Sequence, residues 1–207
     1  MNEFTLKNLE TNRSSKVKKI EWIWAIIRTH KKEIITVIEN DPENIQWKND
    51  WQSWIVFGKK EEWEDTTNTV IREILEETWI LCKKNQIQFA WKVALTFPWN
   101  NWKKITNKID IDIANVFINW KNCAKQNHNN QEIKWIEITS IANLIKTWQE
   151  NNNLIRPWTF ESLYTCLNWG NNSFFLDELR DWKYTKEYTQ KVLSKLINNI
   201  KDIEFIN

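Results

Sequence analysis

The chain has 207 residues, which is enough for one domain with its own hydrophobic core and an extension. Its 29 Lys and Arg nearly balance its 27 Asp and Glu, and this net charge of +2 argues against a nucleic-acid groove. We see no window that is long and apolar enough for a membrane span or a signal peptide. Three scattered cysteines lack metal-binding spacing, so we expect a cytoplasmic protein with reduced thiols.

The order of apolar segments predicts a mixture of strands and helices. In chain order, strands are expected at residues 19–29, 33–39, 55–57, 86–97, 109–118 and 132–138, and helices at residues 66–78, 139–148, 159–167 and 186–203. This order favours an α/β sandwich over residues 18–148. An N-terminal segment, residues 1–17, precedes it. A helical C-terminal extension, residues 149–207, follows it and either covers the core or pairs two chains into a homodimer.

Tryptophan and glycine occur in unusual numbers. The chain has 16 Trp and 2 Gly, whereas glycine ordinarily makes up about 7% of a protein. Several Trp occupy turn positions that favour glycine, as in Asp50-Trp51, Pro98-Trp99 and Asn101-Trp102. We hypothesise that most of them are glycines encoded by UGA and mistranslated under a genetic code that reads UGA as tryptophan. Trp135, in an alternating apolar run, is an exception.

The alternative is a truly Trp-rich protein that binds carbohydrate or nucleic acid. The codons separate the two hypotheses, because UGG at the doubtful positions would exclude recoding.

Residues 58–80 carry the most specific pattern in the chain. The pattern begins with a glycine, and a Glu follows after five intervening residues. After seven more residues come Arg-Glu, an aliphatic residue, one variable residue and Glu-Glu. Two further residues separate this pair from a final aliphatic residue. The matching residues are Gly58, Glu64, Arg72, Glu73, Ile74, Glu76, Glu77 and Ile80. This segment resembles the motif of the Nudix (MutT-like) hydrolase family. Trp79 stands where the family has glycine, which is the exchange that recoding predicts.

The spacing also makes physical sense. Asp65 or Thr66 is expected to cap a helix that ends near Thr78, with a left-handed residue at position 79. At about 100° per residue, the three carboxylates at positions 73, 76 and 77 lie on one side of this helix. The apolar side chains at positions 71, 74 and 75 (Ile71, Ile74 and Leu75) are expected to pack into the core. Clustered carboxylates favour a divalent cation with oxygen ligands. A solvated acidic helix face is the competing interpretation.

The family resemblance implies a Nudix α/β/α sandwich with a mixed sheet. It also implies a Mg²⁺- or Mn²⁺-dependent pyrophosphohydrolase acting on a nucleoside diphosphate linked to a group X. The implied catalytic residues are Glu73, Arg72 and Glu77, with Glu73 either a metal ligand or the general base. The implied metal ligands come from the set Glu73, Glu76, Glu77, Gly58, Glu64 and Glu132.

Two of these assignments have alternatives, and one position departs from the family pattern. Glu64 either supports the junction between loop and helix or binds a second metal. Glu132 is either a ligand from a loop before a late strand or a solvated side chain. Phe57 replaces a glycine that the family usually has before Gly58, which affects the loop geometry there.

The substrate is less constrained than the reaction. Residues 91–97 and the strands after them are similar to the branch of the family that hydrolyses oxidised purine nucleoside triphosphates, and Phe97-Pro98-Trp99 is similar to ADP-ribose pyrophosphatases. Nucleoside triphosphates, ADP-ribose and nucleotide sugars are therefore candidates, and non-catalytic nucleotide sensing is an alternative function. Asp110 and Asp112 alternate on a predicted strand, where they contact either a base or solvent. His30 and His128 receive no role.

Overall fold

The structure is a computed structural model that describes residues 19–29, 31, 33–40, 51–99, 105–118, 133–156, 159–167 and 186–204. Several sequence assignments fall outside these residues. They are the N-terminal segment 1–17, Glu132, His30, His128 and the Asn101-Trp102 turn.

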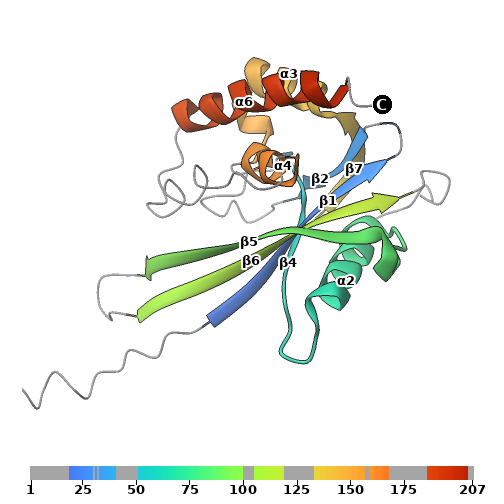
Figure 1. The fold of residues 1–207 in the computed structure, drawn as a ribbon, viewed down its shortest axis with the longest axis vertical. Helices are drawn as coiled ribbons and strands as arrows, with labels where there is room; N and C mark the ends of the chain where they lie inside the picture. Colours follow the sequence, from blue (N-terminus) through green and yellow to red (C-terminus); the bar gives the residue numbers. More distant parts are fainter. Residues whose placement is uncertain are drawn as a thin grey trace, which may run out of the picture.

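A seven-stranded mixed sheet forms the centre of the molecule (Figure 1). Its strands are β1 (Lys19–Thr29), β2 (Glu33–Glu39), β3 (Ser53–Trp54), β4 (Val56–Lys59), β5 (Ile87–Trp99), β6 (Ile105–Ile118) and β7 (Ile133–Ser140). The order is β3-β2-β1-β6-β5, with β4 also paired to β1 and β7 to β2. β1 runs parallel to β6 and antiparallel to β2 and β4, so parallel and antiparallel ladders meet on one strand.

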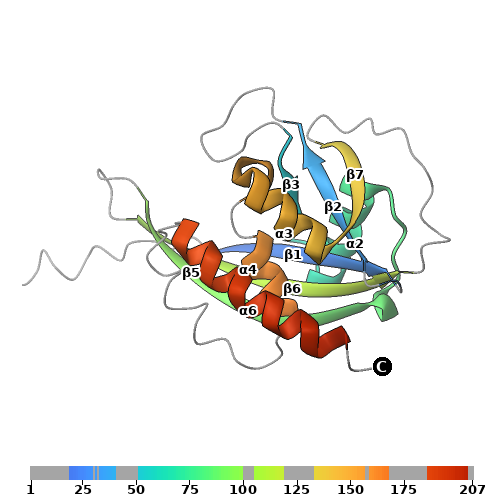
Figure 2. The same cartoon turned by 90° about the horizontal axis from the view of Figure 1, so that it is seen from above.

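Helices cover both faces of this sheet. α2 (Thr66–Thr78) contacts β1 and β4 on one face, whereas α4 (Thr159–Leu167) crosses β1, β5 and β6 on the other. α6 (Lys186–Glu204) packs on α4, and α3 (Ile141–Glu150) follows β7 (Figures 1 and 2). Because both faces are covered, neighbouring residues of β1 such as Ala25, Ile26 and Ile27 are all buried. The α/β/α sandwich predicted from the sequence is confirmed.

Element boundaries agree closely where local signals are strong. The helices at residues 66–78 and 159–167 begin and end as predicted. The helix expected at residues 139–148 spans Ile141–Glu150, and Ser140, the cap that the sequence suggested, caps it by accepting from the Asn143 N–H at 3.1 Å. The single strand expected at residues 55–57 is two strands, β3 and β4, separated by Ile55.

The described part of the C-terminal extension packs against the sheet. A short 3₁₀ helix, η3 (Asn152–Leu154), leads to Ile155, which forms an isolated bridge with Ser53. The Arg156 N–H donates to the Ser53 carbonyl at 3.0 Å. Within the described residues, no helix is long and apolar enough to cross a membrane.

Two tryptophans have a backbone conformation that favours glycine. Trp51 has a φ of 72° and Trp79 a φ of 58°, and no other non-glycine residue among those described has a positive φ. Trp79 ends α2, and its N–H donates to the Leu75 carbonyl at 2.8 Å. The left-handed residue predicted at position 79 is therefore confirmed, and a β-carbon there costs about 1–2 kcal/mol.

Trp79→Gly is accordingly expected to stabilise the protein by about 1–2 kcal/mol, because it removes this steric cost. Thermal denaturation should show the melting temperature rising by roughly 2–4 °C per kcal/mol. Trp63→Gly is the matched control, since Trp63 is 79% exposed but lacks a positive φ. A lower melting temperature for Trp79→Gly than for the control would mean that the indole itself supports the fold.

Candidate active site

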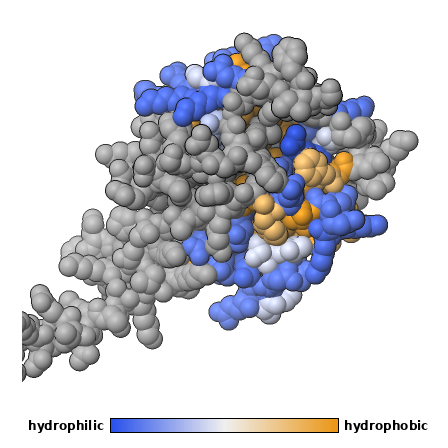
Figure 3. Space-filling model, viewed as in Figure 1, coloured by the Kyte–Doolittle hydropathy of each residue, from blue (hydrophilic) through white to orange (hydrophobic). Residues whose placement is uncertain are grey.

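Helix α2 positions most of the candidate site, and local signals fix where it begins. The Asp65 side chain accepts from the Asn68 N–H at 2.7 Å and so caps the helix. Val70 and Ile74 are completely buried and hold α2 on the sheet. The prediction that Leu75 also packs into the core is wrong, because Leu75 lies beside this buried row and is 37% exposed. Figure 3 shows a small apolar patch among hydrophilic side chains on the face drawn there.

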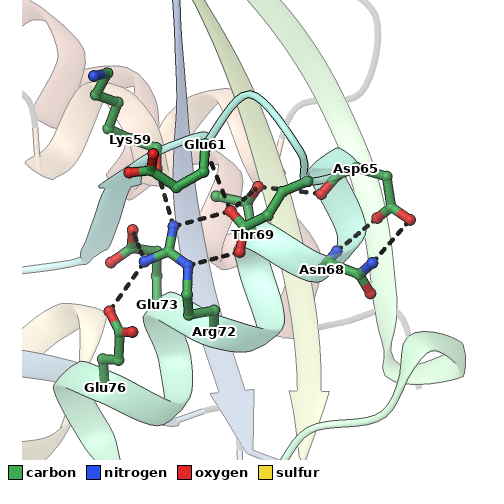
Figure 4. A network of polar contacts seen from close by, with 9 residues as sticks. Lys59, Glu61, Asp65, Asn68, Thr69, Arg72, Glu73 and Glu76 are labelled. Atoms are coloured by element: carbon green, nitrogen blue, oxygen red, sulfur yellow. Dashed lines mark hydrogen bonds and ion pairs between the residues drawn. The ribbon is translucent and has the colours of Figure 1, made fainter.

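Arg72 lies at the centre of a network of acidic side chains (Figure 4). Its Nε and Nη2 atoms donate to the two carboxylate oxygens of Glu64 at 2.7 and 3.0 Å. Its Nη1 atom lies 2.7 Å from Glu73 and 3.0 Å from Glu76. Nη2 also donates to the Lys59 carbonyl at 3.0 Å. The planar guanidinium therefore joins the end of β4, the following loop and α2 in one geometry.

Glu64 anchors the junction between the loop and the helix. It is 6% exposed, and the Thr69 hydroxyl donates to its Oε2 at 3.1 Å. Hydrogen bonds from Arg72 hold the pKa of the Glu64 carboxyl below its usual value. This is one of the two roles expected for Glu64, and its role at a second metal stays a prediction. The Lys59 carbonyl could not be foreseen, because a main-chain acceptor leaves no signal in residue type.

Gly58 makes room for Glu73. A β-carbon at position 58 would lie 1.8 Å from the Glu73 Cδ and 2.0 Å from its Oε1, so only glycine lets this carboxyl lie against β4. Glu73 is 8% exposed. Burial raises the pKa of its carboxyl to about 7, although the adjacent Arg72 acts in the opposite direction. Glycine and carboxylate from distant motif positions therefore form one contact.

The three clustered carboxylates of α2 differ in exposure. Glu73 and Glu77, one turn apart, are each 8% exposed, whereas the Glu76 side chain is 54% exposed. A solvated acidic face therefore describes Glu76 but neither of the other two. These carboxylates, with the main-chain carbonyl of Gly58, are the hard oxygen donors that Mg²⁺ prefers. Within the described residues, no group of three or more His, Cys, Asp and Glu side chains is placed to hold a metal ion.

A second acidic row lies on β6 beside this site. Asp110 and Asp112 pair in register with Glu21 and Ile23 of β1, and Ile23 pairs with Gly58. Asp110 is 5% exposed, so the alternative in which it faces solvent is wrong, and contact with a base stays a prediction. The structure places these two aspartates next to β1. In the sequence, only their alternation along the predicted strand indicated that they share one face.

A cleft of about 360 Å³ opens at the start of β1 and the end of β4. It is lined by Ile20, Glu21, Lys59, Lys60, Glu61, Glu62 and Trp63. Lys60 bonds to Glu21 at 2.8 Å across it. The Lys59 carbonyl, which binds Arg72, connects this cleft to the carboxylate network.

Solved structures share this fold at low sequence identity. An ADP compounds hydrolase is 11% identical over 72% of each chain, with a TM-score of 0.51. A NUDIX hydrolase from Nitrosomonas europaea is 16% identical over 72% of this chain and 88% of its own, with a TM-score of 0.48. A MutT/nudix family protein from Enterococcus faecalis is 13% identical over 66% of this chain, with a TM-score of 0.43. The match spans only 49% of that last protein.

No protein-family model and no curated protein sequence matches the chain. The likeness to the structure with a TM-score of 0.51 shows the fold, which is the α/β/α sandwich that the motif predicted. A fold hosts many functions, so the activity has to be argued from the site.

Proposed function

We propose that the chain is a Mg²⁺- or Mn²⁺-dependent pyrophosphohydrolase. Its substrate would be a nucleoside diphosphate linked to a group X, with an oxidised or ordinary nucleoside triphosphate as the first candidate. One observation carries the proposal: the buried Glu73 carboxyl lies on the Gly58 backbone while Arg72 holds it from the side. A buried carboxylate with a fixed orientation and a raised pKa is typical of a catalytic group.

The chain's own residues would divide the work as follows. Glu73, Glu76 and Glu77, with Glu132 and the Gly58 carbonyl, would hold the metal, which when bound neutralises the diphosphate and activates water. Glu73 could alternatively accept the proton of the attacking water directly. Arg72 keeps the Glu73 carboxyl in place, and Glu64 fixes Arg72 through two hydrogen bonds. Glu64 and Arg72 therefore act through positioning.

Two features favour an enzyme that acts on a nucleotide. Every carboxylate of the motif is present, whereas we expect a sensing module to have lost some of them. The solved structure with a TM-score of 0.51 is that of an ADP compounds hydrolase, which favours an ADP compound among the alternative substrates.

A hydrolysis assay tests the proposal. The protein, made with glycine at the tryptophan positions that the recoding hypothesis assigns to UGA, would be offered nucleoside triphosphates, ADP-ribose and nucleotide sugars with Mg²⁺. We expect one class to be cleaved and EDTA to abolish cleavage, because the metal is needed to neutralise the diphosphate. Nucleotide binding without cleavage of any class would favour sensing over hydrolysis.

A further inference from the structure

The C-terminal extension delivers one side chain to the strand that carries Gly58. The Arg156 guanidinium lies 4.6 Å from the centres of the Trp54 and Phe57 rings. It also forms a 2.5 Å ion pair with Glu39, which is 1% exposed. Together with the bond from the Arg156 N–H to Ser53, these contacts fix the arginine on the sheet, 117 residues after its ionic partner. Burying two charges costs desolvation free energy, which their mutual attraction often fails to offset, so a buried pair of this kind points to a role other than stability.

The rings beside Arg156 form a continuous group, which we call the ring cluster: Trp22, Trp24, Trp54 and Phe57. Trp22 stacks on Phe57 with ring centres 5.5 Å apart and an interplanar angle of 15°. Trp54 meets Phe57 edge-on at 5.8 Å and Trp24 at 6.0 Å. Three of the four rings are therefore indoles, and the four come from β1, β3 and β4.

Two of these indoles are poorly accommodated. The Nε1–H groups of Trp22 and Trp54 are buried and have no hydrogen-bond partner among the described residues. A buried indole N–H ordinarily finds an acceptor. Together with the positive φ of Trp51 and Trp79, this favours glycine as the natural residue at several tryptophan positions.

Glycine at positions 22, 24 and 54 would empty the space that the three indoles fill. The Phe57 ring, the Arg156 guanidinium and the Glu39 carboxylate would remain as its walls. An indole has the fused bicyclic outline of a purine, so the volume of one of these indoles is enough for a purine base. An aromatic ring and a guanidinium plane are surfaces on which bases stack, and a carboxylate accepts from an exocyclic amino group.

We propose that Arg156, Glu39 and Phe57 bind the purine base of the nucleotide substrate in this space. This inference rests on the proposed function. Phe57 directly precedes Gly58, the residue on which the Glu73 carboxyl lies, so the base would bind one residue away from the proposed catalytic carboxylate. Adjacent strand residues face opposite sides of the sheet, and within the described residues β4 pairs with β1 alone, so the diphosphate would run around the unpaired edge of β4 from base to carboxylate. Adenine and guanine both carry an exocyclic amino group from which Glu39 would accept.

Binding of two small probes to the full chain tests this site. With glycine at positions 22, 24 and 54, calorimetry should show AMP binding on the order of tenfold tighter than ribose 5-phosphate, because only AMP carries a base to stack. The chain with all three tryptophans should lack this preference, since the indoles fill the site. Equal binding of the two probes to the glycine form would overturn the proposal.

Two variants of the chain with glycine at positions 22, 24 and 54 test which residues produce the preference for AMP. Arg156→Lys keeps the charge opposite Glu39 but removes the planar fork, and Phe57→Leu removes the opposite ring without touching the ion pair. Each should reduce the preference for AMP by about tenfold. Arg28→Lys is the matched control, because the Arg28 guanidinium also lies over a ring, that of Phe117 at 5.3 Å, but outside the ring cluster. An AMP preference that survives both variants would contradict the assignment.

The same proteins separate this inference from the proposed function. AMP preference without cleavage of any diphosphate would leave the base site standing and remove the hydrolase. Cleavage of ADP-ribose at rates and KM values unaffected by Arg156→Lys and Phe57→Leu would do the reverse.

Discussion

Replacing Glu73 with glutamine is expected to lower turnover by about 10²-fold or more while the protein stays folded. Glutamine has nearly the same shape, so it still fits over Gly58, where the carboxyl now lies 2.0 Å from the position of a β-carbon. It loses the negative charge that would bind a cation or accept a proton. Steady-state hydrolysis with Mg²⁺ measures the loss, and circular dichroism checks the fold. Glu77→Gln is expected to act in the same direction.

Glu150→Gln is the control for this experiment. Glu150 ends α3, and its side chain is 68% exposed and lies 3.9 Å from Lys146 of the same helix, whereas the contacts of Arg72 are with Glu64, Glu73, Glu76 and the Lys59 carbonyl. Its substitution should leave turnover unchanged. Full activity in both Glu73→Gln and Glu77→Gln would remove these two residues from the reaction. Equal losses in all three variants would point to a general effect of charge.

Glu161 is expected to make the protein less stable as the pH rises from about 4.5 to about 7. It lies on α4 with no exposed surface, and burial raises the pKa of its carboxyl to about 7. The Thr189 hydroxyl of α6 donates to it at 3.2 Å. The folded protein keeps this proton up to about pH 7, whereas the unfolded chain releases it near pH 4.5. The free energy of unfolding therefore falls as the pH rises through this range. The destabilisation reaches about 3 kcal/mol above pH 7 and is absent below about pH 4.5.

Glu161→Gln should abolish this pH dependence, because an amide does not ionise. Urea denaturation of both proteins from pH 4.5 to pH 8 would measure it, with the variant gaining up to about 3 kcal/mol relative to the parent at the upper end. Glu187→Gln, at an exposed position on α6, provides the comparison. Parallel stability curves for Glu161→Gln and the parent would mean that the carboxyl is ionised in the folded protein at neutral pH.

The sequence alone determined the features that depend on near neighbours. Helix α2 begins after Asp65 and ends at a left-handed position 79, because capping and chain reversal act within a few residues. The same holds for α4, whose apolar spacing sets its length. The fold followed too, since the fixed spacing from Gly58 to Ile80 resembled a single family.

Only the tertiary structure decided which distant groups meet. The Arg72 guanidinium binds Glu64 with two hydrogen bonds. Leu75, which is as apolar as the buried Ile74, is exposed at the edge of the buried face of α2. Neither Arg156 against Glu39 nor the burial of Glu161 has a local signal. Such contacts depend on how strands and helices are arranged around the sheet, because burial and the meeting of charges are properties of packing between elements and no single segment encodes them.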